Sequence, residues 1–302
     1  MSGISTNRTD ITLPTEIAQE VMSKTQGASA IMRLARRVNL PGRGLTIPVI
    51  TGDPEAAWVA ETGAKPVSNP SLTQKVMQAY KLAVIVPFSD EFRRDLSALY
   101  DAIVERLPGA LALAFDQTVI GAKNKPGENF DNFALCTAQS LVAADSHTAY
   151  KGLVAAYADI AAHNGVLNGF GLAPAGEGLL LGSVDSTGRP IFTAGVGEGN
   201  VNRILGAPVA EGRGLYKAGT AAAGSAAGTP AIVGVAGDWT QAMYGTVEGV
   251  QIRFADQTGL TIASEQINLW EHNMFAVRAE IEVGFRADTN CFNVLTGAIP
   301  TA

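Results

Sequence analysis

Two pairs of carboxylates have a spacing that could support acid–base chemistry. Glu16 and Glu20 are four residues apart in an expected helix, and Glu280 and Glu282 are two residues apart in an expected strand. Each spacing places both side chains on one face of its element. A general acid and a general base could share such a face, but a solvated or interface face is the commoner role on a helix or strand. We therefore interpret both pairs as surface carboxylates.

The histidines and cysteines do not form a pattern typical of a metal site or of a nucleophile with its base. His147, His163 and His272 lie in unrelated segments, and Cys136 and Cys291 are far apart without CxxC spacing. We predict that neither set holds a metal ion. We also predict that both cysteines are free thiols, with a disulfide between them as the alternative.

Known catalytic motifs are missing from the sequence. The glycine-rich segment GVGEGN (195–200) does not have the spacing GxGxxG, and no strand clearly precedes a helix there, so we expect a turn. The sequence also contains no GxSxG, HExxH, Walker or kinase-like motif. These observations predict that the protein is not an enzyme and binds no cofactor.

The composition indicates a protein with few charges on its surface. Charged residues make up 17% of the 302 residues, against about 25% in a typical soluble domain, and 47% are hydrophobic. Either the core is unusually large or much of the surface contacts other chains. No stretch of about 20 residues is apolar enough to span a membrane. The segment MSGISTNRTD lacks the apolar part of a signal peptide, so we expect synthesis in the cytosol and no membrane partner.

The net charge of −6 is unevenly distributed. Residues 1–51 contain six basic and three acidic residues, so this segment carries +3 and the rest of the chain carries −9. An acidic body argues against tight binding of nucleic acid over a broad face, because such binding depends on neutralising phosphates. We predict that the basic residues of the N-terminal segment, among them Arg33, Arg36 and Arg37, contact a polyanion or an acidic neighbour.

The hydrophobic pattern predicts two helical stretches and a long β-arm in the first 90 residues. A helix is expected at LPTEIAQEVM (13–22), and ASAIMRLARRV (28–38) is expected to complete an amphipathic helix pair. Strands are expected at 45–50 and 72–89, on either side of AAWVAETGAKPVSNPS (56–71). A two-stranded arm of this kind is marginal alone and should therefore lie against something else.

A very long helix is expected to follow this arm. Ser89 is a candidate N-cap, and apolar residues recur every three or four positions until about Gly121. A helix from about 89 to 121 would be roughly 45 Å long. Pro108 and Gly109 lie inside it and are expected to bend or interrupt it.

Residues 122–237 and the C-terminal segment are predicted to be rich in short strands. A helix is expected at 151–165, and the Ala/Gly/Ser tract at 218–230 is expected to be a flexible loop. The candidate strands are 178–182, 188–192, 203–212, 231–237, 274–287 and 291–297. Apolar and polar residues alternate along MFAVRAEIEVGFRA (274–287), so one face of that strand should be buried.

The order of these features resembles that of the HK97-type major capsid proteins of tailed bacteriophages. The shared features are an LP.EIA.EV helix, an IPV strand, a W..E loop ending near P..N.S, a KLA..V..S.E strand that enters a very long helix, the segment ILGAPV, and GDW before a terminal antiparallel stretch. The resemblance covers nearly the whole chain. It implies an α+β fold of the HK97-like capsid type.

The resemblance implies a division of the chain into four parts. Residues 1–43 would be the N-arm, and 44–88 the extended β-loop with its strands. The peripheral domain would comprise 89–121, with the long helix as its spine, together with 238–302. Residues 122–237 would form the axial domain.

The resemblance also implies a structural protein of the virion. Copies of such a protein associate into pentamers and hexamers, which form an icosahedral shell around double-stranded phage DNA. Assembly would take place in the cytoplasm of the bacterial host. The expected partners are other copies of the chain, a separate scaffolding protein, a portal, a decoration protein, and packaged DNA through weak, non-specific contacts.

Trp58 acquires a role from this resemblance. The extended loop would lie across a neighbouring subunit, where Trp58 would be a buried anchor and Glu61 and Lys65 would pair with charges at the rim. The alternative is that Trp58 folds back onto its own domain. Some family members form a covalent cross-link between a lysine and an asparagine of neighbouring subunits. Candidates for it here are Lys65 with Asn268, Asn273, Asn290 or Asn293.

The sequence is also compatible with two other functions. An encapsulin-like shell, which encloses an enzyme in a bacterial compartment, would share the fold and assemble without a scaffold. A soluble α+β enzyme or binding module would be a monomer or small oligomer with a ligand pocket. The missing catalytic motifs and the long β-arm count against the second alternative.

Overall fold

The computed structural model describes most of the chain as a mixed α+β protein. The described residues are 15–42, 45–50, 58–59, 72–91, 96–142, 148–184, 187–192, 203–222, 227–247, 249–256, 259–262 and 265–299. Within them, a five-stranded and a six-stranded sheet form the body, and two two-stranded ribbons are separate from both sheets. None of the described helices is long and apolar enough to cross a membrane.

The five-stranded sheet is built around β14 (Met274–Ala287). This strand pairs antiparallel with β4 (Tyr80–Ser89), β10 (Ala242–Thr246) and β11 (Gln251–Ala255), and β1 (Arg36–Asn39) pairs parallel with β10. The apolar residues of β14 are buried, and the charged residues between them are half-buried. The predicted alternation is thereby confirmed.

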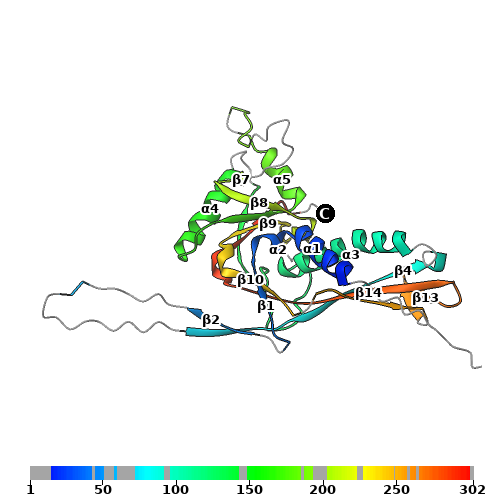
Figure 1. Ribbon diagram of the computed structural model, residues 1–302. Coiled ribbons are helices and arrows are strands. Elements are labelled where there is room, and N and C mark those ends of the chain that lie inside the picture. The colour runs from blue at the N-terminus through cyan, green and yellow to red at the C-terminus, as the bar shows by residue number, and fades with distance from the viewer. Residues whose placement is uncertain are drawn as a thin grey trace, which may run out of the picture.

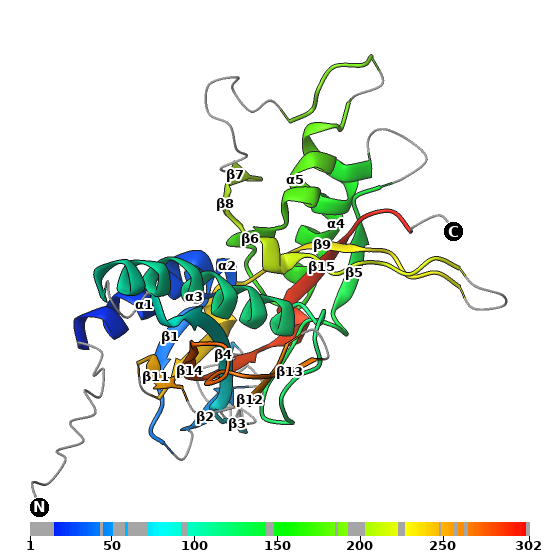
Figure 2. The same ribbon diagram turned by 90° about the vertical axis from the view of Figure 1, so that its right-hand side faces the viewer.

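Helices cover one face of this sheet. The long helix α3 (Leu96–Val119) packs on β4, and α1 (Thr15–Ala28) lies alongside α3 (Figure 2). The short helix α2 (Ala30–Leu34) follows α1 and leads into β1. The predicted helix pair is therefore correct only up to Leu34, because Arg36–Asn39 find a parallel strand partner in β10.

The described part of the long helix runs from Leu96 to Val119. Ser89 ends β4, and its hydroxyl accepts a hydrogen bond from the backbone N–H of Glu91 at 3.4 Å. The helix continues through Pro108, so the predicted alternative of an interruption there is wrong. Leu107 and the residues one turn further on are buried in the core, so packing holds the helix together on both sides of the proline.

The six-stranded sheet lies above the middle of the molecule, with two helices packed on it (Figure 1). In sheet order its strands are β5 (Thr137–Ser140), β15 (Phe292–Thr296), β9 (Ile232–Gly237), β6 (Gly169–Leu172), β8 (Ala207–Glu211) and β7 (Arg203–Ile204). The helices are α4 (Thr148–Ala162) and α5 (Pro174–Leu181). The predicted helix at 151–165 and the strands at 231–237 and 291–297 are confirmed. The strand expected at 203–212 is divided at residues 205–206 into β7 and β8, which pair with each other.

Two predicted strands of this region are wrong. Residues 178–181 belong to α5, because Pro174 stands at the start of the helix and Leu180 packs into the core from one helical face. The close approach of α5 to β9 also requires Gly176, where a Cβ atom would lie 2.6 Å from the carbonyl oxygen of Val233. In the segment 188–192, only Pro190 makes a β-bridge, to Val184.

The two sheets are connected by a cluster of aromatic side chains. The rings of Phe133 and Phe292 stack at 4.7 Å between centroids, and Trp239 meets Phe292 edge-on at 5.2 Å. Asp238 fixes this junction, since its carboxylate accepts hydrogen bonds from the Asn168 side chain at 2.8 Å and from backbone N–H groups. The GDW segment is therefore a structural joint between β9 and β10.

Strand β15 crosses from the five-stranded sheet region to the six-stranded sheet. It follows β14 after a single 3₁₀ turn, η4 (Thr289–Cys291), but pairs with β9 and β5 in the six-stranded sheet. Two further 3₁₀ turns, η2 (Arg213–Leu215) and η3 (Trp239–Gln241), connect elements of the body.

The molecule is elongated along the direction of its ribbons. In Figure 1 the ribbon β2 (Leu45–Ile50) and β3 (Leu72–Met77) projects from one end of the five-stranded sheet. The ribbon β12 (Gly259–Ile262) and β13 (Glu265–Asn268) lies at the opposite end. The six-stranded sheet with α4 and α5 rises between them, which gives the body an L-like outline.

Candidate assembly surfaces

The ribbon of β2 and β3 projects from the body (Figure 1). β2 and β3 pair antiparallel from Leu45 opposite Met77 to Ile50 opposite Leu72. The predicted two-stranded arm is thereby confirmed, although the strand expected at 72–89 is divided at Gln78–Ala79 into β3 and β4. The ribbon pairs with neither sheet, and a two-stranded ribbon gains stability only when its faces are covered.

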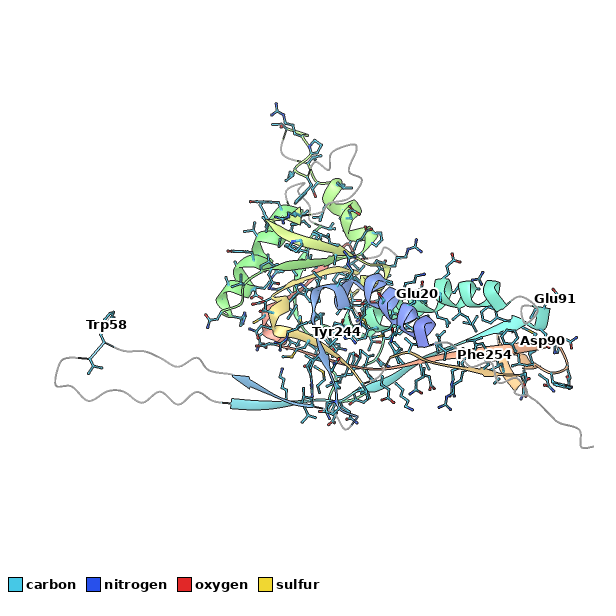
Figure 3. The ribbon with its side chains drawn as sticks, in the orientation of Figure 1. Glu20, Trp58, Asp90, Glu91, Tyr244 and Phe254 are labelled. Atoms are coloured by element: carbon cyan, nitrogen blue, oxygen red, sulfur yellow. The ribbon has the colours of Figure 1, made fainter. Side chains whose placement is uncertain are left out.

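Trp58 lies beyond the end of this ribbon, far from the body (Figure 3). Its side chain has 106% of the reference exposure, and the neighbouring Val59 is also exposed. Trp58 therefore does not fold back onto its own domain in this structure. A fully solvated indole at the end of an arm is typical of a side chain that becomes buried against another molecule.

The other predicted residues of this arm cannot be placed with Trp58. Glu61 and Lys65 lie outside the described residues. Of the asparagines considered as cross-link partners, Asn293 is completely buried in β15, whereas Asn268, Asn273 and Asn290 are exposed.

The base of the ribbon is packed tightly on the body. Met77 and Leu40 are buried and form a small apolar cluster with Met243 of β10. The chain of β3 also passes close to Gly284 of β14, where a Cβ atom would lie 2.6 Å from the carbonyl oxygen of Gln78. Only a glycine at this position allows the two strands to approach so closely.

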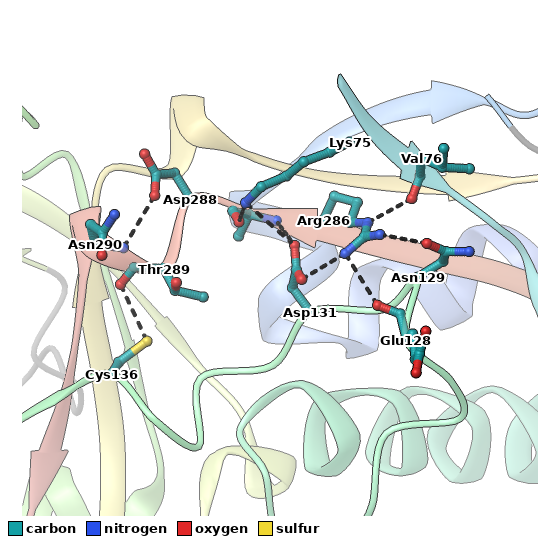
Figure 4. A network of polar contacts seen from close by, with 11 residues as sticks. Lys75, Val76, Glu128, Asn129, Asp131, Cys136, Arg286, Asp288, Thr289 and Asn290 are labelled. Carbon is teal, nitrogen blue, oxygen red and sulfur yellow. Dashed lines mark hydrogen bonds and ion pairs between the residues drawn. The ribbon is translucent and has the colours of Figure 1, made fainter. Parts of the chain in front are cut away.

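A network of charged and polar groups fixes the same base (Figure 4). The guanidinium of Arg286 donates to Asp131 at 2.7 Å, to the carbonyl oxygen of Val76 at 2.7 Å and to the Asn129 side chain at 2.9 Å. Lys75 donates to the carbonyl oxygen of Ala287 at 3.1 Å. The network thus joins β3, β14 and the loop after α3.

The basic residues of the N-arm are exposed but do not share one face. Arg33 lies in the last turn of α2, and Arg36 and Arg37 are consecutive residues of the edge strand β1. Consecutive residues of a strand point to opposite faces of the sheet. Arg36 donates to the sulfur of Met243 at 3.4 Å. The three arginines are therefore not the single basic patch that a helix would have produced.

A buried carboxylate ties the N-terminal helices to α3. The Ser29 hydroxyl and the backbone N–H of Ala30 both donate to Asp116, the latter at 3.0 Å. Ser29 also caps α2 by accepting from the N–H of Met32 at 3.1 Å. Burial raises the pKa of Asp116 to about 7, although these hydrogen bonds oppose the increase.

Three of the four carboxylates considered for acid–base chemistry form ion pairs instead. Glu280 pairs with Arg278 at 3.3 Å and Glu282 with Lys81 at 3.7 Å, so these carboxylates form surface ion pairs. Glu20 pairs with Lys24 at 3.0 Å in the same way. No cluster of three His, Cys, Asp or Glu side chains suited to a metal ion occurs in the described part of the chain.

Both cysteines are free thiols, which confirms the favoured prediction. Burial raises the pKa of Cys136 to about 12 and also raises the pKa of Cys291, and nearby aspartates add to both increases. The rings of His163 and His272 each contact a backbone carbonyl oxygen four residues earlier, at 2.8 and 2.9 Å. None of these groups is placed to act as an activated nucleophile with its base.

The fold, with its long helix, projecting ribbon and two sheets, is shared by solved structures from phage sources. A solved structure from Gordonia phage Cozz has a TM-score of 0.68 and 22% identity, over 90% of this chain and 87% of that chain. A structure from Mycobacterium phage Adephagia also has a TM-score of 0.68, with 18% identity over 100% of this chain and 96% of that one.

Sequence comparison identifies the family. Residues 9–296 match the Phage capsid family, so the chain belongs to this family. A relative, "Probable major capsid protein gp17" of Mycobacterium phage L5, is 28% identical over 309 residues, which cover 96% of this chain and 90% of the relative. The protein is therefore a structural component of a phage capsid, which self-assembles into capsomers, and is not an enzyme. The compartment alternative is not favoured.

The sequence did not reveal two sets of polar contacts within the body. These are the contact of Arg286 with Asp131 and the hydrogen bonds that Asp116 accepts from Ser29 and Ala30. Arg286 and Asp131 are 155 residues apart and share no local motif. Asp116 offered a weak signal, because it is an acidic residue among the buried apolar positions Ala112, Phe115 and Val119 of the long helix.

Proposed function

We propose that this capsid protein assembles by laying its β2–β3 ribbon on a neighbouring copy, with Trp58 as the apolar anchor. The observation that carries the proposal is the complete exposure of Trp58 at the far end of a projecting arm. Burying such a side chain contributes about 1.5–3 kcal/mol per contact. Because every copy in a shell makes the contact once, a modest energy is multiplied over the whole particle.

Charged residues of the arms complete the proposed interface. Glu61 and Lys65, which follow Trp58 in the sequence, would form ion pairs at its rim, each contributing about 0–1 kcal/mol. Arg33, Arg36 and Arg37 are exposed on α2 and β1 and would contact an acidic neighbour or a polyanion. The low charge fraction of the chain, 17%, is consistent with a surface that is largely covered by other copies.

The proposed division of labour follows the four parts of the chain. Residues 1–43 would be the N-arm, 44–88 the extended loop, 89–121 with 238–302 the peripheral domain, and 122–237 the axial domain. The N-arm and the extended loop would both be attached to the peripheral domain, since α1 packs on α3 and β4 pairs with β14. The proposed partners beyond the chain itself are a separate scaffolding protein, a portal, a decoration protein and packaged DNA in weak, non-specific contact.

Replacing the anchor tests the proposal. In Trp58→Ala, the yield of shells or capsomers at a fixed subunit concentration should fall about tenfold or more, measured by sedimentation and negative-stain imaging. Trp58→Phe is the matched control and should retain most of the assembly, since it keeps an aromatic ring. The unfolding curves of both variants should equal that of the parent, because the side chain is solvated in the subunit. Normal assembly of Trp58→Ala would falsify the proposal.

A further inference from the structure

A pocket with an apolar interior lies between α3, β4 and the loop that follows α3. It has a volume of about 210 Å³. Its apolar walls are Tyr80, Leu82, Phe115, Phe130 and Val283. An aromatic ring could be accommodated in a space of this kind, because pockets that bind organic groups are mainly apolar with a few polar groups at fixed positions.

The walls of this pocket are held in place by their own contacts. Phe130 meets both Phe115 and Tyr80 edge-on, with 6.3 Å between ring centroids in each pair. The Tyr80 hydroxyl accepts a hydrogen bond from the N–H of Asn129 at 3.3 Å. Phe115 and Phe130 also belong to the main core. The pocket is therefore preformed in the single subunit.

The mouth of the pocket carries positive charge. Lys81 and Lys123 both line it, and Lys125 follows two residues later in the same loop. Lys81 forms an ion pair with Glu282 at 3.7 Å, and the two side chains are 69% and 37% exposed. A pair this exposed contributes little, so the lysines remain able to attract a further anionic group.

The segment around Trp58 has the complementary character. Between Arg43 and Lys65 the sequence contains no basic residue and three acidic ones, Asp53, Glu55 and Glu61. The exposed indole is therefore flanked along the chain by negative charge. The ribbon carries Trp58 away from its own body (Figure 3), so the pocket available to it belongs to another copy.

We propose that this pocket on one copy receives the indole of Trp58 from the ribbon of a neighbouring copy. Lys81 and Lys123 would then face the acidic residues that flank the tryptophan. The inference rests on the proposed function, because it assumes that Trp58 is an assembly anchor. It adds the receiving site and the charges that attract the flanking residues.

A cysteine pair tests the contact directly. Thr118 lines the pocket and is only partly exposed. The thiol is placed at the exposed neighbour Val59, so that the indole of Trp58 is kept. In assembled Val59→Cys/Thr118→Cys protein, mild oxidation should give a ladder of disulfide-linked multimers on a non-reducing gel. The matched control is Val59→Cys/Tyr150→Cys, because Tyr150 is exposed on α4 of the other sheet. The control and Val59→Cys alone should remain monomeric. Equal ladders in all three, or none with position 118 in intact shells, would overturn the inference.

Filling the pocket separates this inference from the proposed function. Thr118→Trp should lower the yield of shells about as much as Trp58→Ala, and the double variant should show no further loss, because both changes remove one contact. If Trp58→Ala prevents assembly but Thr118→Trp does not, the pocket assignment is wrong and the anchor role stands. If Thr118→Trp prevents assembly but the Val59→Cys/Thr118→Cys protein gives no cross-link, another segment occupies the pocket and the inference fails. If Trp58→Ala assembles normally, both fail.

Discussion

The guanidinium of Arg286 lies 2.7 Å from the carboxylate of Asp131, and this contact joins the end of β14 to the loop after α3 at the base of the ribbon. The two side chains are 11% and 19% exposed. Arg286 also donates to the backbone of β3, so one guanidinium connects three segments that are distant in the sequence. Charge-assisted hydrogen bonds in such partly buried positions are stronger than those at the surface.

Removing this guanidinium should destabilise the subunit. Arg286→Ala leaves a partly buried carboxylate and a strand carbonyl without their donor, and we expect the free energy of unfolding to fall by about 1–3 kcal/mol. Denaturant unfolding of the unassembled subunit measures it. The control is Lys81→Ala, whose ion pair with Glu282 is largely exposed and whose loss should change stability by less than about 0.5 kcal/mol. Equal effects of the two variants would contradict the special role of Arg286.

Two glycines should respond to alanine in opposite directions. In Gly284→Ala the new Cβ atom meets the carbonyl oxygen of Gln78 at 2.6 Å, so the ribbon base must move, and stability should fall by about 1–3 kcal/mol. In Gly109→Ala nothing lies within 4 Å of the new atom. This glycine is inside α3, so alanine should raise stability by about 0.5–1 kcal/mol. A loss of equal size at both positions would show that the close approach at Gly284 is not the cause.

Asp116 should make the stability of the subunit depend on pH. Its pKa is about 7 in the folded protein, because burial disfavours the charged form, and near 3.8 when exposed. Between these values the folded state binds more protons than the unfolded state, so stability should decrease as the pH rises from about 4 to about 7 and then level off. The decrease is at most about 4 kcal/mol.

Asp116→Asn isolates this contribution. The amide has no charge to titrate and can still accept from Ala30 and donate to Ser29. Unfolding free energies of the parent and the variant should therefore diverge as the pH rises from about 4 to about 7, with the parent losing stability relative to the variant. Parallel pH profiles would show that Asp116 does not titrate in this range.

The native thiols should be nearly inert in the folded subunit. A pKa of about 12 for Cys136 leaves a very small thiolate fraction at pH 8, and Cys291 is buried. Alkylation by iodoacetamide should be at least about a hundredfold slower than at the exposed thiol of Trp58→Cys, and equally fast once the chain is unfolded. Mass spectrometry of the labelled peptides measures both rates. Rapid labelling of Cys136 in the folded state would contradict its raised pKa, and the residue would then have to be replaced before the cross-linking experiment.

The sequence predicted those elements whose pattern is local. The alternation along Met274–Ala287 and the apolar periodicity of Leu96–Val119 are visible in one segment, and both elements are present. Arg36–Asn39 became a strand because of β10, whose residues lie more than 200 positions later. No local pattern contains that partner. For the same reason, the sequence did not predict the contact of Arg286 with Asp131, because only the folded chain brings these residues together.

The direct continuation of β3 into β4 determines how the shell would carry mechanical load. In the proposed contact, a force that pulls neighbouring copies apart would put tension on the ribbon, and this tension would pass along the backbone into β4. That strand is paired with β14 over its full length, from Tyr80 to Ser89. Hydrogen bonds between strands are perpendicular to the strand direction, so tension along β4 loads them in shear, all at once, rather than peeling them one by one. The arm is thus anchored in the geometry that resists stretching best.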